Sequence, residues 1–162
     1  MRSGGRAWCV IQRSAVTPLP ETEVGLEALT LDPNAVYCAY EFWTGEVWIV
    51  NGQIHLKALS LGDTQVIALT RLDGDAPILI GSDRHVSCDA VSVAEVETRE
   101  RRTALRLSGF AGLEVKYAFY APEAAEILQA VGIEAQIERD GEVLRVVVRF
   151  SDSEGKLVLG RP

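Results

Sequence analysis

The chain has 162 residues, a formal net charge of −7 and a pI of about 4.9. This acidic balance disfavours a nucleic-acid partner, because binding to phosphate groups requires a basic surface. Hydrophobic residues make up 48% of the chain and charged residues 24%, which is typical of a globular protein and not of a disordered one. The sequence has no apolar run of about 18 residues, so we expect no membrane partner.

The amino-terminus and the cysteines bear on the cellular compartment and on metal binding. Residues 1–6 lack the apolar core of a signal peptide, which predicts a cytoplasmic protein unless the chain is part of a longer secreted one. Cys9, Cys38 and Cys88 lack metal-ligand spacing and lie in apolar surroundings, so we expect three small buried residues. We expect no metal and no other cofactor, because His55 and His85 lie in different halves of the chain.

Short alternating segments, separated by turn residues, predict an all-β antiparallel fold. In the first half they cover residues 8–12, 23–29, 36–43, 46–50, 53–57 and 64–69. In the second half they cover residues 90–96, 103–107, 113–120, 133–139, 142–150 and 156–159. Residues 122–132 fit either a short helix, with proline in its first turn and glycine at its end, or a strand, and the neighbouring strands favour a strand.

A polar stretch at residues 71–77 interrupts this periodicity and predicts a linker. The chain then divides into two β-sandwich lobes, residues 1–72 and residues 73–162. The core of each lobe alone is marginal, because small domains bury a smaller fraction of their surface than large ones. We therefore expect the two lobes to pack together.

Two glycine turns predict the registers of two hairpins, because Asn-Gly and Asp-Gly favour two-residue loops. Around Asn51-Gly52 the apolar face is expected to hold Val47, Ile49, Ile54 and Leu56. The opposite face is expected to hold Glu46, Trp48, Gln53, His55 and Lys57, with Trp48 either exposed or covered by another segment. Around Asp140-Gly141 the expected apolar pairs are Ile137 with Leu144, Ala135 with Val146 and Ile133 with Val148.

The aromatic strand at residues 36–43 leads to a family resemblance. The run Tyr40-Glu41-Phe42-Trp43-x-Gly45, the hairpin after it and the strand at residues 64–69 resemble the C-terminal β-sandwich of melibiase-type α-galactosidases and related glycosidases. Residues 8–11 and 26–33 resemble the opening strand, second strand and turn of that module. Residues 76–86 resemble a strand that opens a further β lobe, although the family's glycine shortly after His85 is missing here.

The resemblance implies an accessory role. These glycosidases cleave sugars with two carboxylates carried on a (β/α)₈ barrel. A chain of 162 residues without alternation of strands and helices does not contain that barrel, so we expect no enzyme activity. The expected partner is a saccharide or a glycosidase catalytic domain. The resemblance also implies that Trp43 is a structural tryptophan packed in the core.

The polar face of the first hairpin is the leading candidate for carbohydrate binding. An aromatic plane stacks on the apolar C–H face of a sugar, and polar groups around it bond the hydroxyls. The candidate residues are Trp48, His55, Gln53, Lys57 and Trp43. The alternative is that Trp48 packs beneath a loop or against the other lobe.

Two further alternatives remain open. Asp83, Arg84 and His85 follow a Gly-Ser turn, and form either a structural polar cluster or, with Cys88, the reactive groups of a small hydrolase. The chain is alternatively a structural or oligomerisation domain, a homo-oligomer whose aromatic residues are buried between copies. A deep pocket at His85 favours the hydrolase, and a concentration-dependent dimer favours the structural domain.

Overall fold

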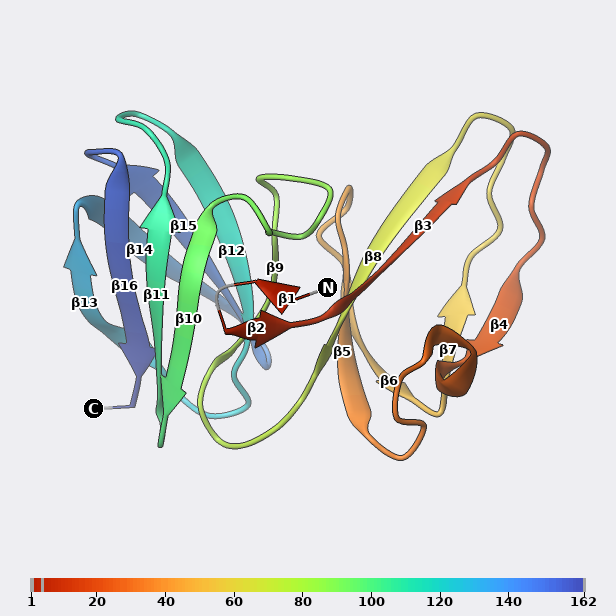
Figure 1. The fold of residues 1–162 in the computed structure, drawn as a ribbon, viewed down its shortest axis with the longest axis horizontal. Helices are drawn as coiled ribbons and strands as arrows, with labels where there is room; N and C mark the ends of the chain where they lie inside the picture. The colour runs from red at the N-terminus through yellow and green to blue at the C-terminus, as the bar shows by residue number, and fades with distance from the viewer. Residues whose placement is uncertain (1, 4, 162) are drawn as a thin grey trace.

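The computed structural model describes residues 2–3 and 5–161 and shows an all-β protein, which confirms the predicted fold class. Figure 1 shows two lobes side by side along the longest axis, with the amino-terminus near their junction. The strand pairs are antiparallel in both lobes. Within the described residues, no helix has the length and apolar character needed to cross a membrane.

The first lobe is one six-stranded sheet that curls around its own core. Its spatial order is β3 (Cys9–Ser14), β8 (Thr64–Arg71), β5 (Val36–Glu41), β6 (Val47–Asn51), β7 (Gln53–Leu56) and β4 (Thr22–Gly25). The curl brings β3 near the far side of the sheet, where Arg13 donates hydrogen bonds to the carbonyl of Lys57, just after β7, at 2.9 Å and to the carbonyl of Pro20, just before β4, at 3.4 Å. The bridge between Leu19 and Leu59 extends the pairing of β4 with β7 beyond the ends of these strands. Side chains from all six strands therefore pack on one core.

One part of the predicted strand at residues 23–29 is wrong. Leu26–Leu29 form a 3-10 helix, η1, directly after β4. Leu26 is fully buried, and its backbone N–H bonds the carbonyl of Gly52 at 2.9 Å. The turn ends at Thr30, which adopts a left-handed conformation with φ of 58°. The helical turn places Leu26 in the core of the first lobe, beside the turn at Gly52.

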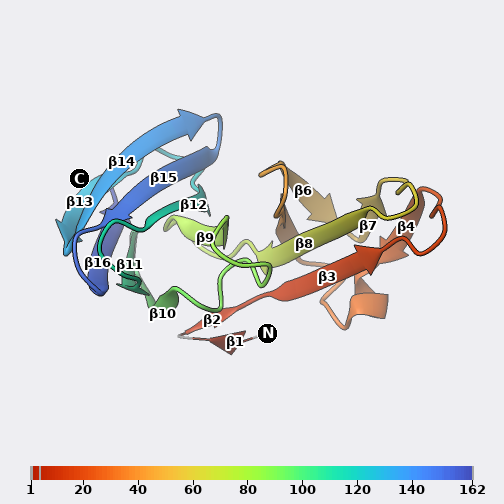
Figure 2. The same cartoon turned by 90° about the horizontal axis from the view of Figure 1, so that it is seen from above.

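The second lobe is a sandwich of two four-stranded sheets. One sheet has the order β10 (Val93–Arg99), β11 (Arg102–Ser108), β16 (Glu154–Gly160) and β13 (Glu126–Val131). The other has the order β14 (Ile133–Asp140), β15 (Val143–Phe150), β12 (Glu114–Tyr120) and β9 (Ile78–Ser82). Figure 2 shows β14 and β15 in one layer and β10 and β11 in the other. Residues 126–131 form a strand, as their neighbours favoured.

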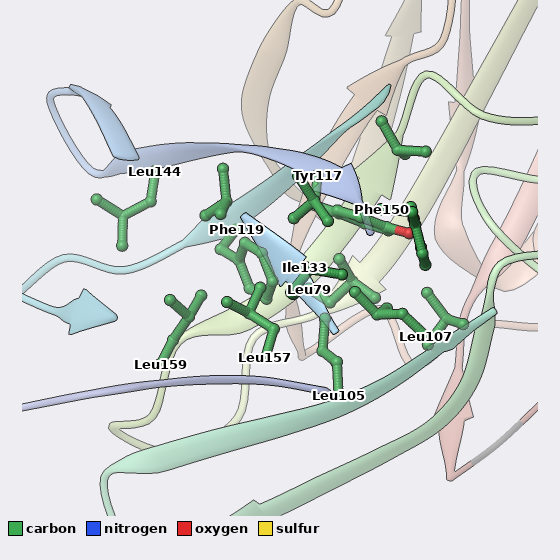
Figure 3. Packing of buried hydrophobic residues seen from close by; sticks show 14 of the residues in the cluster. Leu79, Leu105, Leu107, Tyr117, Phe119, Ile133, Leu144, Phe150, Leu157 and Leu159 are labelled. Carbon is green, nitrogen blue, oxygen red and sulfur yellow. The ribbon is translucent and has the colours of Figure 1, made fainter. Parts of the chain in front are cut away.

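The core of the second lobe lies between its two sheets, where leucines from β11 and β16 meet aromatic residues of β12 and β15 (Figure 3). Buried and outward side chains alternate along β15 between Val143 and Val148, as the pleat of a strand requires. Tyr117, Phe119 and Phe150 are almost completely buried. Each fully buried Leu or Phe contributes about 1.5–3 kcal/mol relative to an exposed one. The layer between the sheets is therefore the main source of stability of this lobe.

Both predicted hairpin registers are displaced. In the first hairpin Asn51 pairs with Gln53 across Gly52, one residue away from the prediction, and β6 and β7 pair at no other position described. A shift of one residue reverses the face of a strand. Val50, which is 2% exposed, therefore joins Ile54 in the core, and Ile49 is 41% exposed. The second hairpin is displaced by two residues, since Ile137 pairs with Val146, so its predicted apolar face is retained.

The amino-terminal strands lie outside the predicted first lobe. β1 (Arg2–Ser3) and β2 (Arg6–Ala7) pair with each other, and β1 contacts β10 of the second lobe. Gly5, between them, lies directly against the backbone carbonyl of Val96. The segment thus spans the junction of the lobes before β3 enters the first sheet (Figure 1).

A shared buried cluster joins the two lobes. It contains Trp8, Cys38, Tyr40, Val66 and Ala68 from the first lobe and Ile80, Cys88 and Ala118 from the second. The indole N–H of Trp8 donates a buried hydrogen bond of 2.8 Å to the carbonyl of Ser87. This cluster fixes how the lobes meet, and the cleft at their junction has walls from both.

Candidate binding cleft between the lobes

The junction of the lobes contains a cleft of about 460 Å³. The first lobe contributes Tyr40, Phe42, Trp43, Thr44 and Gly45, and the second contributes Asp83, Lys116, Tyr117, Ala118 and Arg145. Sites for small molecules enclose about 300–1,000 Å³. The cleft is therefore large enough for one or two sugar rings, and it combines aromatic, cationic, anionic and hydroxyl groups.

Trp43 is exposed at the turn between β5 and β6, which corrects the expectation that it packs in the core. Its side chain is 58% exposed, and the ring of Phe42 meets it edge-on at a centroid distance of 4.8 Å. The buried carboxylate of Glu41 accepts hydrogen bonds from the backbone N–H and the hydroxyl of Thr44, at 2.7 and 2.8 Å. Gly45 completes this tight turn with φ of 69°. The turn holds Phe42 against the buried cluster and leaves Trp43 in solvent.

Two cations and one carboxylate lie on the second-lobe side of the cleft. The guanidinium of Arg145 donates a hydrogen bond to the carbonyl of Gly45 at 3.1 Å. Among the described residues, neither Arg145 nor Lys116 has a carboxylate partner within ion-pair distance. Asp83 accepts the backbone N–H of Lys116 at 2.8 Å, which fixes its carboxylate at the rim.

Tyr40 and Tyr117 form the buried floor. Burial raises the pKa of Tyr40, and the negative charge of Asp83 raises it further, while Arg145 acts in the opposite direction. Burial also raises the pKa of Tyr117, whose hydroxyl lies 2.8 Å from the hydroxyl of Ser92. Both phenols are therefore neutral at physiological pH, when each can donate and accept a hydrogen bond.

The residues predicted for carbohydrate binding separate into different places. Trp48, His55 and Lys57 line a hollow of about 180 Å³ together with Glu46 and Gln65. Polar contacts occupy its rim, since Lys57 forms an ion pair with Glu46 at 2.7 Å and the Nε2 of His55 lies 2.9 Å from a carboxylate oxygen of Glu21. Trp48 is half-buried because the displaced register turns it towards the first core.

The other two predicted residues do not join this hollow. Gln53 donates a hydrogen bond to Glu23 at 2.7 Å on the paired strand β4, and Trp43 lies at the cleft. Sequence reasoning missed Lys116 and Arg145 as cleft residues. Each is an ordinary outward position on a strand, and no local pattern shows that these two positions face the turn at Trp43.

The segment with Asp83, Arg84 and His85 is a loop and not a strand, because β9 ends at Ser82. His85 bonds Ser87 through Nδ1 at 3.0 Å, away from Asp83, which bonds Lys116. The guanidinium of Arg84 lies over the ring of Phe110 at 5.8 Å. The polar cluster of this region is centred on a different residue, Asp89.

Asp89 is the buried centre of the loop that follows β9. Its carboxylate accepts hydrogen bonds from the hydroxyls of Ser82 and Ser92 and from the backbone N–H groups of Val91 and Ser92. Cys88 and Asp89 both have positive φ, 50° and 146°, a conformation that strains residues with a Cβ. Four hydrogen bonds to one carboxylate offset that strain. Cys88 is completely buried, so its thiol is not placed to attack a substrate.

The described residues do not bring three or more His, Cys, Asp or Glu side chains close enough together to hold a metal ion. Comparison with known protein families and with curated proteins finds no match to this sequence.

Proposed function

We propose that this protein is a non-catalytic saccharide-binding module whose site is the cleft around Trp43. The observation that carries the proposal is an exposed indole, held by a rigid turn, beside a cleft lined with hydrogen-bonding groups. A pyranose ring places its C–H face on such an indole, and its hydroxyls bond polar groups at the rim.

Size and chemistry favour the cleft over the hollow at Trp48. The hollow encloses about 180 Å³, below the usual range of ligand sites, and its polar groups already contact one another, Lys57 with Glu46 and His55 with Glu21. The cleft encloses about 460 Å³, and its cations have no carboxylate partner among the described residues. Its described lining residues include a single carboxylate, Asp83, whereas glycoside hydrolysis uses two. A binding role fits this inventory better than a hydrolytic one.

Tryptophan fluorescence tests the proposal, because Trp8, Trp43 and Trp48 lie in three different environments. The protein is titrated with α-galactosides, β-glucans, mannans and acidic oligosaccharides up to about 10 mM, above the Kd of about 1 mM expected of a shallow site. At least one sugar class should give a saturable change. Trp43→Ala should abolish it, and Trp48→Ala, the matched control, should retain it.

Three other outcomes would overturn the assignment. Loss of binding in Trp48→Ala but not in Trp43→Ala would move the site to the hollow. A flat response of the folded protein to every sugar would remove saccharide binding. The third outcome combines a flat response with a dimer in sedimentation. If Trp43→Ala dissociates that dimer, the surface around Trp43 is an interface between copies of the protein.

A further inference from the structure

We infer that the cleft selects an acidic saccharide, in which a uronate carboxylate binds Arg145 and Lys116 while the sugar ring stacks on Trp43. This inference rests on the proposed function and names the class of sugar. It follows from the charges at the cleft, which differ from those of the molecule as a whole.

Arg145 brings a positive charge into the cleft without a counter-ion among the described residues. Its side chain is half-buried at the base of the cleft, where a charge without a counter-ion is costly. The described residues supply one neutral acceptor, the carbonyl of Gly45, and no carboxylate within ion-pair distance. Glu138 is paired with Arg145 across the sheet, yet it forms no ion pair with it in the described structure. A guanidinium has five N–H donors in a planar fork that matches a carboxylate, so most of its donors are available to a ligand.

Lys116 is the second cation of the cleft. It lies on β12, two strand positions from Ala118, which is the residue paired with Arg145. Lys116 is exposed and lines the same cleft. Together the two residues place two positive charges against the single negative charge of Asp83, in a chain whose net charge is −7. At physiological ionic strength charges are screened beyond about 8 Å, so the local cations decide what binds in the cleft.

Trp43 is the group that distinguishes an acidic sugar from a simple anion. Arg145 bonds the carbonyl of Gly45, within the turn that carries the exposed indole. A ring stacked on Trp43 therefore has its substituents near the guanidinium. A free phosphate or sulfate meets the cations and gains nothing from the indole. A neutral sugar meets the indole and leaves the cations unpaired.

The test compares matched ligands by calorimetry on the intact protein. The probes are trigalacturonate, its carboxyl-reduced neutral counterpart, a sulfated galactotriose and inorganic sulfate. We expect trigalacturonate to bind at least about tenfold more tightly than the neutral trisaccharide, the usual effect of a charge-assisted hydrogen bond. Tighter binding of the sulfated sugar than of the uronate would assign the anion as a sulfate ester and overturn the uronate assignment.

Three variants identify the residues. Arg145→Gln should lower the affinity for trigalacturonate about tenfold and change the affinity for the neutral trisaccharide by no more than about twofold. Lys116→Gln should lower the affinity for trigalacturonate about threefold. This variant tests the cations independently if the Arg145 variant disturbs the turn at Gly45. Arg149→Gln is the control, since Arg149 lies on the same face of β15 but lines a different hollow.

The outcomes separate this inference from the function on which it rests. Equal affinity of the wild type for the uronate and for the neutral trisaccharide would overturn the acidic selectivity and retain a saccharide site. Equal weakening by Lys116→Gln and Arg149→Gln would overturn the assignment of the cations. Inorganic sulfate binding as tightly as the acidic sugars would remove the role of Trp43, and no binding of any probe would overturn both proposals.

Discussion

The ring of Tyr40, at the end of β5, lies flat against the backbone of Gly81 on β9. A methyl group added at Gly81 would stand 2.7 Å from the ring carbon Cε1, far inside contact distance. Tyr40 belongs to the first lobe and Gly81 to the second, so the contact sets how closely the lobes approach. It also sets the width of the cleft, which Tyr40 lines.

Gly81→Ala should therefore lower the free energy of unfolding by about 1–3 kcal/mol, the usual cost of overpacking. Urea denaturation measures this loss. In a Tyr40→Leu background the same substitution should cost less, because the flat ring is gone and the two changes are coupled. Additive losses in the double mutant would show that the methyl group is accommodated elsewhere.

Asp89→Ala should destabilise the protein by about 2–4 kcal/mol, because it leaves buried N–H and hydroxyl groups without their acceptor. Chemical denaturation gives the value. Asp152→Ala is the matched control. That carboxylate is exposed and accepts the N–H of its neighbour Ser153 alone among the described donors, so we expect a change within about 0.5 kcal/mol. Similar losses in both variants would contradict the role of Asp89 as the centre of the loop.

The tryptophans should differ sharply in their effect on stability. Trp8→Ala should cost about 3–5 kcal/mol, because Trp8 is 5% exposed, joins the lobes and bonds Ser87. Trp43→Ala should change the free energy of unfolding by no more than about 0.5 kcal/mol, because Trp43 is 58% exposed. Iodide should quench the emission of the wild type and quench Trp43→Phe much less. A large loss of stability in Trp43→Ala would show that Trp43 is packed in the core and not exposed.

Stability should fall in alkaline solution. Burial raises the pKa of Cys38 from 9.0 to about 12, and the negative charge of Glu142 adds to the effect. Between these values the unfolded thiol has lost its proton and the folded one keeps it, so the native state loses about 1.4 kcal/mol for each pH unit. The contribution is complete below pH 9 and disappears as the pH approaches 12.

Thermal or urea unfolding between pH 8 and about pH 10 measures this slope before tyrosine ionisation becomes large. Cys38→Ala should lower stability at pH 8, because it leaves a small cavity, and should also flatten the slope between pH 9 and 10. An unchanged slope in the variant would assign the alkaline loss to other groups.

The alternation of apolar and polar residues predicted most strands and part of the core of the second lobe. The apolar face predicted around Asp140-Gly141 lies in the core, since Leu144, Val146 and Val148 are fully buried and Ile133 is 7% exposed. The second hairpin kept its predicted face although its register moved by two residues, because a shift of two leaves each side chain on the same side of the sheet.

The same alternation predicted the wrong buried face for β6 in the first hairpin, where both faces carry apolar residues. Asn51-Gly52 favours a two-residue loop, but β6 pairs along its length with β5 and β7 with β4, and β6 meets β7 at Asn51 and Gln53 with Gly52 alone between them. The curled sheet decided that Val50, and not Ile49, is buried. Trp48 became half-buried as a consequence.

The sequence by itself determined the all-β class, most strand positions and the apolar face of the second hairpin, because these follow from the two-residue period of a strand. The tertiary structure alone decided that Trp43 is exposed and that Arg145 and Lys116 share a cleft with it. Arg145 lies 102 residues from Trp43 in the sequence, and the packing of Tyr40 on Gly81 holds the turn after β5 against the sheet that contains both β9 and β15. Such a contact depends on how two sheets meet, and no property of either segment alone encodes it.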